Sequence, residues 1–439
     1  MMKCRFVKGT EENLKEICDE LGARGKMDLG PVISVVQGVL DDIKRRGDEA
    51  VLEYTQKFDK AVLTSKTMAV TEDEIKSAYA SLEKEDPELL RIMKTAASNI
   101  RTFHEKQKEE GFMMDTAKGS KIGVRVRPIT VAGVYVPGGT APLPSTVLMD
   151  VIPASVAGVP RIVFCTPPRA DGTIAPVILA AADIAGATEI YKVGGAQAIA
   201  AMAYGTETIP RVDKICGPGN IYVNTAKRLV FGQVDIDMFA GPSEVVIIAD
   251  ETSNPEYVAA DMLAQAEHDK LASAIVLATG EELATKIWEA ADRRSDAADR
   301  KVQLEGSMEN YSSVICVDSL KTAIAFSEEL APEHLELCVK DPEETLNQIN
   351  NAGAVFLGNF SPEPLGDYFA GPNHTLPTSG TARFFSPLNT GDFYKKMSVI
   401  NYNEESLKEV YKDVAKFARS EGLTCHALSI ESRFEDINE

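Results

Sequence analysis

Short apolar runs alternate with alanine-rich segments through the middle of the chain. The run RIVFCTPP (161–168) ends in two prolines, and PVILAAADIAG (176–186) follows it with the composition of a buried helix. Strands that are buried on both faces of a parallel sheet have this continuous apolar character, because crossover helices cover the sheet. The pattern predicts an α/β protein with two Rossmann-like domains, incomplete and atypical for nucleotide folds. The expected strands lie at 133–139, 161–168, 189–193, 244–250, 273–279, 312–318 and 354–360.

Helical periodicity dominates the first 115 residues. The stretches 31–58 and 87–110 place apolar residues three and four apart, with charges between them. The period changes to two at 120–136, which favours strands, and 404–422 again has a helical pattern.

These patterns predict four parts. They are an N-terminal helical segment at 1–30, a discontinuous first α/β domain at 31–134 and 244–385, a second α/β domain at 135–243, and a C-terminal tail at 386–439.

The charge balance excludes some partners. The chain has 46 basic and 66 acidic residues, a net charge of −20. Such an acidic surface repels phosphate backbones and anionic lipid heads, so we expect no nucleic acid and no membrane as partner.

The cysteines and the N-terminus indicate the cytoplasm. The seven cysteines are scattered, without a C-x-x-C pair, as expected for reduced thiols. No stretch approaches the roughly 20 apolar residues of a membrane span, and the first residues turn polar at once.

Histidine is scarce, with five residues in the chain. His104 lies in a charged helix and is expected on the surface. Gln265 and His268 are three positions apart in YVAADMLAQAEHD, so they share one helical face. The pair suits half of a metal site, although a chance pairing on a helix explains the spacing equally well.

Glu333 and His334 are adjacent in APEHLEL. A carboxylate and an imidazole that reach one cleft supply two proton-transfer groups of different pKa. The alternative is a solvated helix start, because Pro332 suits a first helical turn.

Two further polar groups stand in unusual places. Asp367 and His374 occur in a loop rich in glycine and proline, where polar residues are often functional. Glu421 and His426 fall near the C-terminus, and a capping or surface role remains open for each residue.

Three stretches suit a nucleotide. VGGAQAIAAMAYG (193–205) predicts a strand, a Gly-Gly turn and a helix, whose N-terminus attracts anions. DKICGPGNIYV (213–223) adds a tight Gly-Pro-Gly loop, and MFAGPSEVVIIAD (238–250) places Ser243 before a strand. Neither standard glycine-rich nucleotide motif is present. The residues alone thus indicate an α/β enzyme with a metal and a dinucleotide.

Eight motifs in order resemble the histidinol dehydrogenase family, from about residue 30 to 430. They are GVYVPGGTAPLPSTVLM, GGAQAIAAMAYG, DKICGPGN, AGPSE, LAQAEHD, APEHLEL, GPNHTLPT and EGLTCHA. Ser379 and Pro387 stand where relatives often differ, in the loop before the tail.

The resemblance implies a role for each matching residue. The implied zinc ligands are Gln265, His268, Asp367 and His426, and the implied catalytic pair is Glu333 and His334. The implied substrate contacts are Ser243, Gln265, His268, His334, Asp367, Glu421 and His426, and the implied NAD contacts are Tyr135, Gln197 and Asn220. The tail is expected to cross to a second subunit, so that a homodimer shares its active sites.

The resemblance also implies the reaction: L-histidinol, two NAD⁺ and water give L-histidine and two NADH through L-histidinal, as the last step of histidine biosynthesis. One Zn²⁺ per subunit is expected, with Mn²⁺ as a possible substitute. Three alternatives stay open: a related dehydrogenase for another small alcohol, a zinc hydrolase that uses Glu333, and a binding or scaffold protein.

Overall fold

A computed structural model describes residues 4–22, 30–138 and 142–435. The chain forms two compact units. The large unit comprises Met1–Gln107 and Ile129–Phe393, and the small unit comprises Lys108–Pro128 and Tyr394–Glu439. Both expected α/β sheets lie in the large unit, so the predicted α/β class is confirmed.

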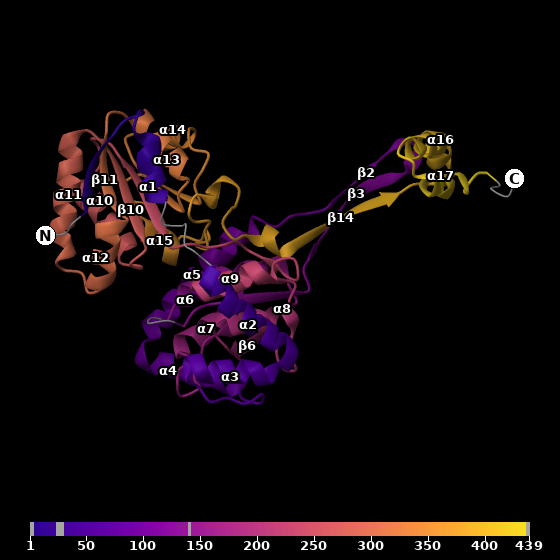
Figure 1. Cartoon of the computed structure of the whole chain (residues 1–439), viewed down its shortest axis with the longest axis horizontal. Coiled ribbons are helices and arrows are strands. Elements are labelled where there is room, and N and C mark those ends of the chain that lie inside the picture. Colours follow the sequence, from indigo (N-terminus) through magenta and orange to yellow (C-terminus); the bar gives the residue numbers. More distant parts are fainter. Residues whose placement is uncertain (1–3, 23–29, 139–141, 436–439) are drawn as a thin grey trace. The chain divides into compact units, whose positions relative to one another are not determined.

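The first sheet of the large unit has six parallel strands (Figure 1). In sheet order they are β1 (Arg5–Gly9), β11 (Ser313–Val317), β10 (Ser273–Thr279), β9 (Glu244–Ala249), β12 (His334–Cys338) and β13 (Ala354–Leu357). Helices cover both faces. They are α1 (Leu14–Gly22), α10 (Pro255–Ala266), α11 (Glu281–Ser295), α12 (Lys301–Asn310) and α13 (Leu320–Leu330), with the shorter α14 (Pro342–Leu346) and α15 (Glu363–Tyr368) beside them.

The alternation of side chains along β9 explains why both faces are apolar. Val245 and Ile247 pack in one core with α10, α11 and α12, whereas Val246 and Ile248 pack in the other core with α1 and α13. Successive side chains of a strand point to opposite faces, so a fully apolar strand requires two covered faces.

The second sheet of the large unit has five parallel strands. In sheet order they are β6 (Glu189–Lys192), β5 (Arg161–Thr166), β4 (Val131–Tyr135), β7 (Lys214–Cys216) and β8 (Asp235–Ile236). Its helices are α2 (Gly30–Arg46), α3 (Asp48–Asp59), α4 (Glu72–Glu85), α5 (Pro87–Glu105), α6 (Pro144–Ala157), α7 (Pro176–Ala185), α8 (Gly195–Tyr204) and α9 (Ile221–Val230).

The assignment of residues 31–134 to the domain of 244–385 is wrong. Helix α2 packs on α8 and α9, α4 packs on α7, and α5 packs on α6. The helices α6, α7, α8 and α9 all cover the five-stranded sheet. Strand β4 lies in the middle of the same sheet. The apolar stripes of these helices, such as Val36, Leu40 and Ile43 of α2, complete the core of that sheet.

The N-terminal segment 1–30 is also only partly helical. Helix α1 is present, but Arg5–Gly9 forms the edge strand β1, which pairs with β11. Residues 1–3 and 23–29 of this segment lie outside the described residues.

His104 is buried, which corrects the expected surface position. It continues the stripe of Met93, Ala97 and Ile100 on the buried face of α5. Its Nδ1 lies 2.6 Å from Gln107 Oε1, and burial lowers the pKa of the imidazole.

The small unit joins two distant segments. Strand β14 (Tyr394–Asn401) pairs antiparallel with β3 (Lys121–Pro128), which also pairs with β2 (Phe112–Asp115). Helices α16 (Glu404–Ser420) and α17 (Thr424–Glu431) complete the unit. The predicted tail at 386–439 is therefore corrected: residues 386–393 belong to the large unit, and an earlier part of the chain supplies two strands.

No helix within the described ranges is long and apolar enough to cross a membrane.

We expect Phe326→Ala to destabilise the large unit. Phe326 belongs to α13 and is fully buried against the six-stranded sheet. Deletion of such a ring costs about 3–5 kcal/mol of unfolding free energy. Urea denaturation followed by circular dichroism measures the change. Phe360, which is 86% exposed, provides the control, and Phe360→Ala should cost less than about 1 kcal/mol. Equal midpoints for the two variants would contradict the described core.

Candidate functional site

Glu333 and His334 lie at the amino end of β12. Helix α13 ends at Leu330, and Ala331 adopts a left-handed conformation with φ of 48°. The chain then enters β12 at His334, so these residues start a strand and not the helix that Pro332 suggested. Both side chains are buried.

The backbone of Glu244 holds both side chains. Glu244 N–H donates to Glu333 Oε2 at 2.9 Å, and His334 Nδ1 lies 3.1 Å from Glu244 O. Glu244 is the first residue of β9, which pairs with β12 in the register His334↔Val245. The pairing of two central strands therefore fixes the positions of the predicted catalytic pair.

The tautomer of His334 follows from this contact. A carbonyl oxygen only accepts hydrogen bonds, so Nδ1 carries the proton and Nε2 has a lone pair. Burial lowers the pKa of His334, although Asp367 opposes this effect. Nε2 has no hydrogen-bond partner among the described residues and lies 3.8 Å from Asp367 Oδ1. His334 is a neutral imidazole with an available base nitrogen.

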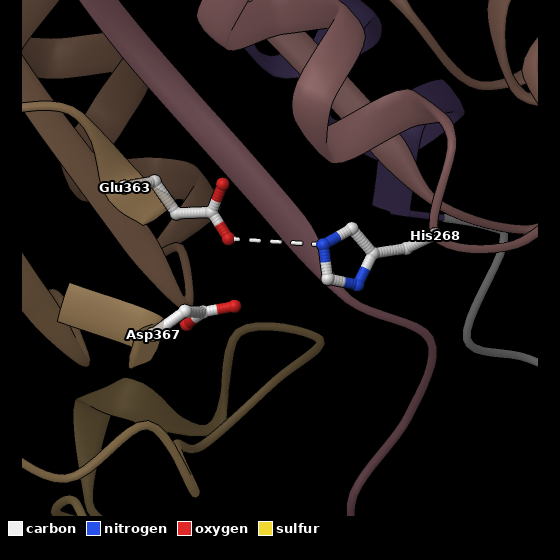
Figure 2. A group of neighbouring side chains, drawn as sticks. All are labelled: His268, Glu363 and Asp367. Atoms are coloured by element: carbon white, nitrogen blue, oxygen red, sulfur yellow. Dashed lines mark ion pairs between the residues drawn. The ribbon is translucent and has the colours of Figure 1, made fainter. Parts of the chain in front are cut away.

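Three donor groups meet beside this nitrogen. One ligand atom each from His268, Glu363 and Asp367 lies within 4.8 Å of the others (Figure 2). His268 follows the end of α10, whereas Glu363 and Asp367 come from α15. The distance from His268 Nε2 to Glu363 Oε1 is 4.0 Å. Imidazole nitrogen and carboxylate oxygen are ligands that zinc and manganese accept.

Gln265 supports the same interpretation. It lies in the last turn of α10, fully buried, and neither polar atom of its amide has a hydrogen-bond partner in the described part of the chain. A buried amide without partners is costly, and a cation satisfies its carbonyl oxygen. The residues present thus fit a divalent metal ion.

Sequence reasoning missed Glu363. It is 1% exposed, and burial, followed by the charges of Asp367, Glu336 and Glu333, raises its pKa to about 10. The available signal was its position four residues before Asp367, which places both carboxylates on one face of a helix. That helix is a short element in a loop region, and six residues are too few to show a helical periodicity.

Asp367 also contacts His374, the loop histidine to which the sequence pattern assigned no role. His374 Nδ1 lies 3.0 Å from the backbone oxygen of Asp367 and 3.8 Å from Asp367 Oδ1. His334, Asp367 and His374 line a cavity of about 600 Å³, a volume that suits a small ligand. Apolar side chains, including Phe103, Phe356 and Leu376, form much of its remaining wall.

Ser243 directly precedes Glu244 at the amino end of β9 and is partly buried. Its carbonyl accepts a hydrogen bond from Ser273 N at 3.1 Å, which fixes the start of β9 against β10. Five predicted substrate residues therefore lie at one end of the six-stranded sheet, where two strands start and two of its helices end. They are Ser243, Gln265, His268, His334 and Asp367.

Glu421 and His426 lie in the small unit, where both are exposed. They line a hollow of about 500 Å³ between α16 and α17, together with apolar residues such as Phe417 and Leu423.

The predicted NAD residues follow strands of the five-stranded sheet. Tyr135 ends β4 and is buried, and its hydroxyl accepts a hydrogen bond from Gly195 N at 3.1 Å. Gln197 lies in the first turn of α8, buried, with no partner for Nε2 among the described residues. Asn220 caps α9, because its Oδ1 accepts from Tyr222 N and Val223 N.

A buried ion pair holds the loop before Asn220. Lys227 Nζ donates to Gly217 O at 2.9 Å and pairs with Asp237, whose Oδ2 accepts from Gly217 N at 2.8 Å. Gly217 has φ of 112°, and a Cβ there would lie 2.0 Å from Tyr135 O. A cavity of about 550 Å³ opens beside Asn220. The structure leaves Gln197 Nε2 for a ligand acceptor, which fits a bound nucleotide.

Comparisons with known proteins agree with this arrangement. Residues 23–434 match the family described as histidinol dehydrogenase. The histidinol dehydrogenase of Clostridium acetobutylicum is 51% identical over 404 residues, which cover 92% of this chain and 93% of that protein. The enzyme of Caldanaerobacter subterraneus subsp. tengcongensis is 52% identical over 418 residues, 95% of this chain and 96% of that protein.

A solved structure supports the fold over the whole length. The crystal structure of histidinol dehydrogenase from Elizabethkingia anophelis superposes with a TM-score of 0.92 at 41% identity and covers 100% of both chains. The resemblance carried by the sequence motifs is thereby confirmed. The chain belongs to the histidinol dehydrogenase family, whose members are oxidoreductases.

Proposed function

We propose that this oxidoreductase converts L-histidinol to L-histidine through L-histidinal, with two NAD⁺ as hydride acceptors and one zinc ion per chain. The observation that carries the proposal is the unpartnered Nε2 of the neutral His334 beside the donors of His268, Glu363 and Asp367. This nitrogen can accept a proton from an alcohol that is held at the metal position.

The proposed metal site would position the substrate. When bound there, zinc, or manganese in its place, would supply positive charge and coordination positions for the amine and imidazole of histidinol, and so would orient its alcohol carbon. Gln265, His268 and Asp367 are the proposed ligands from the large unit, and His426 is the proposed ligand from the tail.

His334 moves protons in both oxidation steps. As hydride leaves the alcohol carbon for the first NAD⁺, Nε2 accepts the hydroxyl proton and the aldehyde forms. As water adds to the aldehyde, the protonated imidazole returns this proton to the aldehyde oxygen and the hydrate forms. The same nitrogen, again neutral, then accepts a hydroxyl proton of the hydrate as the second hydride leaves for the second NAD⁺. The hydrogen bond to Glu244 O keeps the Nδ1 proton in place and the ring aligned throughout.

Glu333 assists the addition of water. Its Oε2 is anchored by Glu244 N–H, and the carboxylate lies next to the imidazole, with His334 Nδ1 and Glu333 Oε2 3.8 Å apart. We assign it the proton that water loses as its oxygen attacks the aldehyde carbon.

The dinucleotide is proposed to bind at the carboxyl ends of the five-stranded sheet, near Tyr135, Gln197 and Asn220. The unpartnered Gln197 Nε2 offers a hydrogen bond, and the clamped Gly217 loop brings backbone groups near Asn220. Ligands of open parallel sheets commonly occupy this edge.

The small unit supports a homodimer. Its only buried apolar side chains within the described residues are Ala415 and Ala427, whereas Phe417 is 70% exposed and Ile400 75% exposed. A unit with so little core gains stability by covering this surface. We propose that a second copy of the chain does so, and that Glu421 and His426 then enter the partner's active site.

The seven cysteines are free in the structure, which supports a reducing compartment. We therefore place the reaction in the cytoplasm, as the last step of histidine biosynthesis, without nucleic-acid or membrane partners.

We expect the purified protein with zinc to release two NADH per L-histidinol, measured by absorbance at 340 nm at limiting substrate. A chelator should abolish turnover and zinc should restore it. One NADH per alcohol would indicate an enzyme that stops at the aldehyde. Absence of NADH with histidinol, but turnover of another small alcohol, would indicate a related dehydrogenase, and absence with every alcohol would contradict the assignment.

Substitutions should separate catalysis from metal binding. We expect His334→Ala to lower kcat by about 10²–10⁴-fold, as does loss of a general base, while its metal content stays at the wild-type value. We expect His268→Ala to lose the metal, measured by elemental analysis after dialysis. A metal-replete, active His268→Ala variant would show that the metal lies elsewhere.

Mixing two inactive variants tests the shared site. In a hybrid of Glu333→Ala and His426→Ala chains, one of the two sites retains both groups. At full exchange half of the dimers are hybrids, so activity should return to at most about a quarter of the wild-type value. Co-expression with two affinity tags ensures that hybrids form. Isolated hybrids without activity would contradict a shared site.

A further inference from the structure

The side chain of Glu363 has no function in the scheme above, although it lies at the metal position. Figure 2 shows its carboxylate, that of Asp367 and the His268 ring directed toward a common space. The side chain is 1% exposed, and no N–H or cationic group in the described ranges donates to its oxygens; without a metal the carboxyl can only share a proton with Asp367.

No cationic side chain compensates Glu363. Its one ion-pair neighbour among the described residues is His268, at 4.0 Å, and no lysine or arginine there pairs with it. Buried carboxylates are normally paired or bound to a metal, because the charged form is poorly solvated.

A backbone hydrogen bond fixes the position of this residue. Glu336 Oε1 accepts a hydrogen bond from Glu363 N at 2.8 Å, which ties the start of α15 to β12. Glu363 and Asp367 then share one face of α15, one turn apart. The strand that carries His334 thus also positions Glu363.

The distances suit a shared ion. Two donor atoms that are each about 2.0–2.2 Å from one zinc ion lie about 3–4.4 Å apart. The 4.0 Å between His268 Nε2 and Glu363 Oε1 falls in this range, and the 4.8 Å that bounds all three donor separations exceeds its upper end by about 0.4 Å.

Charge gives a further reason. The ligands Gln265, His268, Asp367 and His426 carry one negative charge against two positive charges of the ion. A carboxylate from Glu363 brings the buried cluster to neutrality, which lowers the cost of holding the ion away from water.

We propose that Glu363 is a metal ligand, so that the large unit of one chain binds a divalent cation through Gln265, His268, Glu363 and Asp367 without His426. This inference rests on the proposed metal dependence of the enzyme. His426 then adds affinity to a site that one chain has already formed, and Glu363 would leave the ion when the amine and imidazole of the substrate bind, because one zinc ion does not hold seven donors.

The test is the affinity of the full-length apoprotein for Co²⁺ and Zn²⁺, by chelator competition, together with the visible absorption spectrum of the Co²⁺ form. We expect Glu363→Gln to weaken binding by more than about 10-fold, because even outer groups of metal sites change affinity by 10–100-fold. The Co²⁺ spectrum should change, since a ligand is lost. His426→Ala should still bind one ion per chain. The variant that combines Glu363→Gln with His426→Ala should bind none.

Two controls make the result specific. Asp250→Asn also removes a buried carboxylate of the six-stranded sheet but retains an oxygen for Lys340 N–H, and it should bind metal within about 3-fold of the wild type. Glu344→Gln changes an exposed carboxylate and should have no effect. If Glu363→Gln does not fold, Glu363→Asp retains the charge and withdraws the oxygens, and it should weaken binding and shift the Co²⁺ spectrum.

The outcomes separate the two proposals. Unchanged affinity and spectrum in a folded Glu363 variant, with metal loss in His268→Ala, would overturn the role of Glu363 and keep the metal site. Unchanged binding in both variants would overturn the metal site itself. Equal weakening in Asp250→Asn would show a general charge effect and also overturn the ligand assignment.

Discussion

The proposed active site depends on two hydrogen bonds to the backbone of one residue, Glu244. Its N–H donates to Glu333, and its carbonyl oxygen accepts from His334 Nδ1. These contacts follow from the parallel pairing of β9 with β12, which sets His334 beside Val245. The protonation of His334 is thereby decided by the sheet, because a carbonyl partner leaves Nε2 as the base. A shift of β12 by one residue would turn His334 to the other face and remove the base from the site.

The two sheets of the large unit present functional residues at opposite edges. In the five-stranded sheet the proposed nucleotide residues follow strands: Tyr135 ends β4, and Gly217 comes directly after β7. This is the edge that open parallel sheets commonly use for ligands. In the six-stranded sheet the chemistry lies at the amino ends, where Ser243 precedes β9 and His334 begins β12. The reverse edge is available because α10 and α15 end there with Gln265, His268 and Asp367.

The sequence was informative where one element decides the outcome. Apolar runs such as 244–250 and 273–279 predicted the central strands, because a strand that is buried on both faces can be recognised alone. The sequence prediction failed where the position of a residue depends on a distant part of the chain that packs against it. The apolar stripe of α2 shows that the helix is buried but not which sheet it covers, and the stripe of α5 includes His104 only because α6 covers that face. Glu363 was missed for the same reason: its meaning comes from His268, 95 residues earlier in the chain, and from the hydrogen bond to Glu336.

Two buried acidic groups of the large unit differ in how their charge is balanced, and the difference separates structure from chemistry. Asp237 is paired with the fully buried Lys227 and accepts hydrogen bonds from Gly217 N and Met238 N, so the protein alone satisfies it. Glu363 is equally buried but has no cationic partner in the described chain, and Gln265, three residues before His268, is also unsatisfied. Asp237 thus has a lysine to balance its charge, whereas Glu363 has none in the described chain. Without a metal, burial and the neighbouring carboxylates raise the pKa of Glu363, so the carboxyl keeps its proton. We propose that a cation from solution takes the place of that proton, next to Asp367 and His334 Nε2, where the substrate must be positioned.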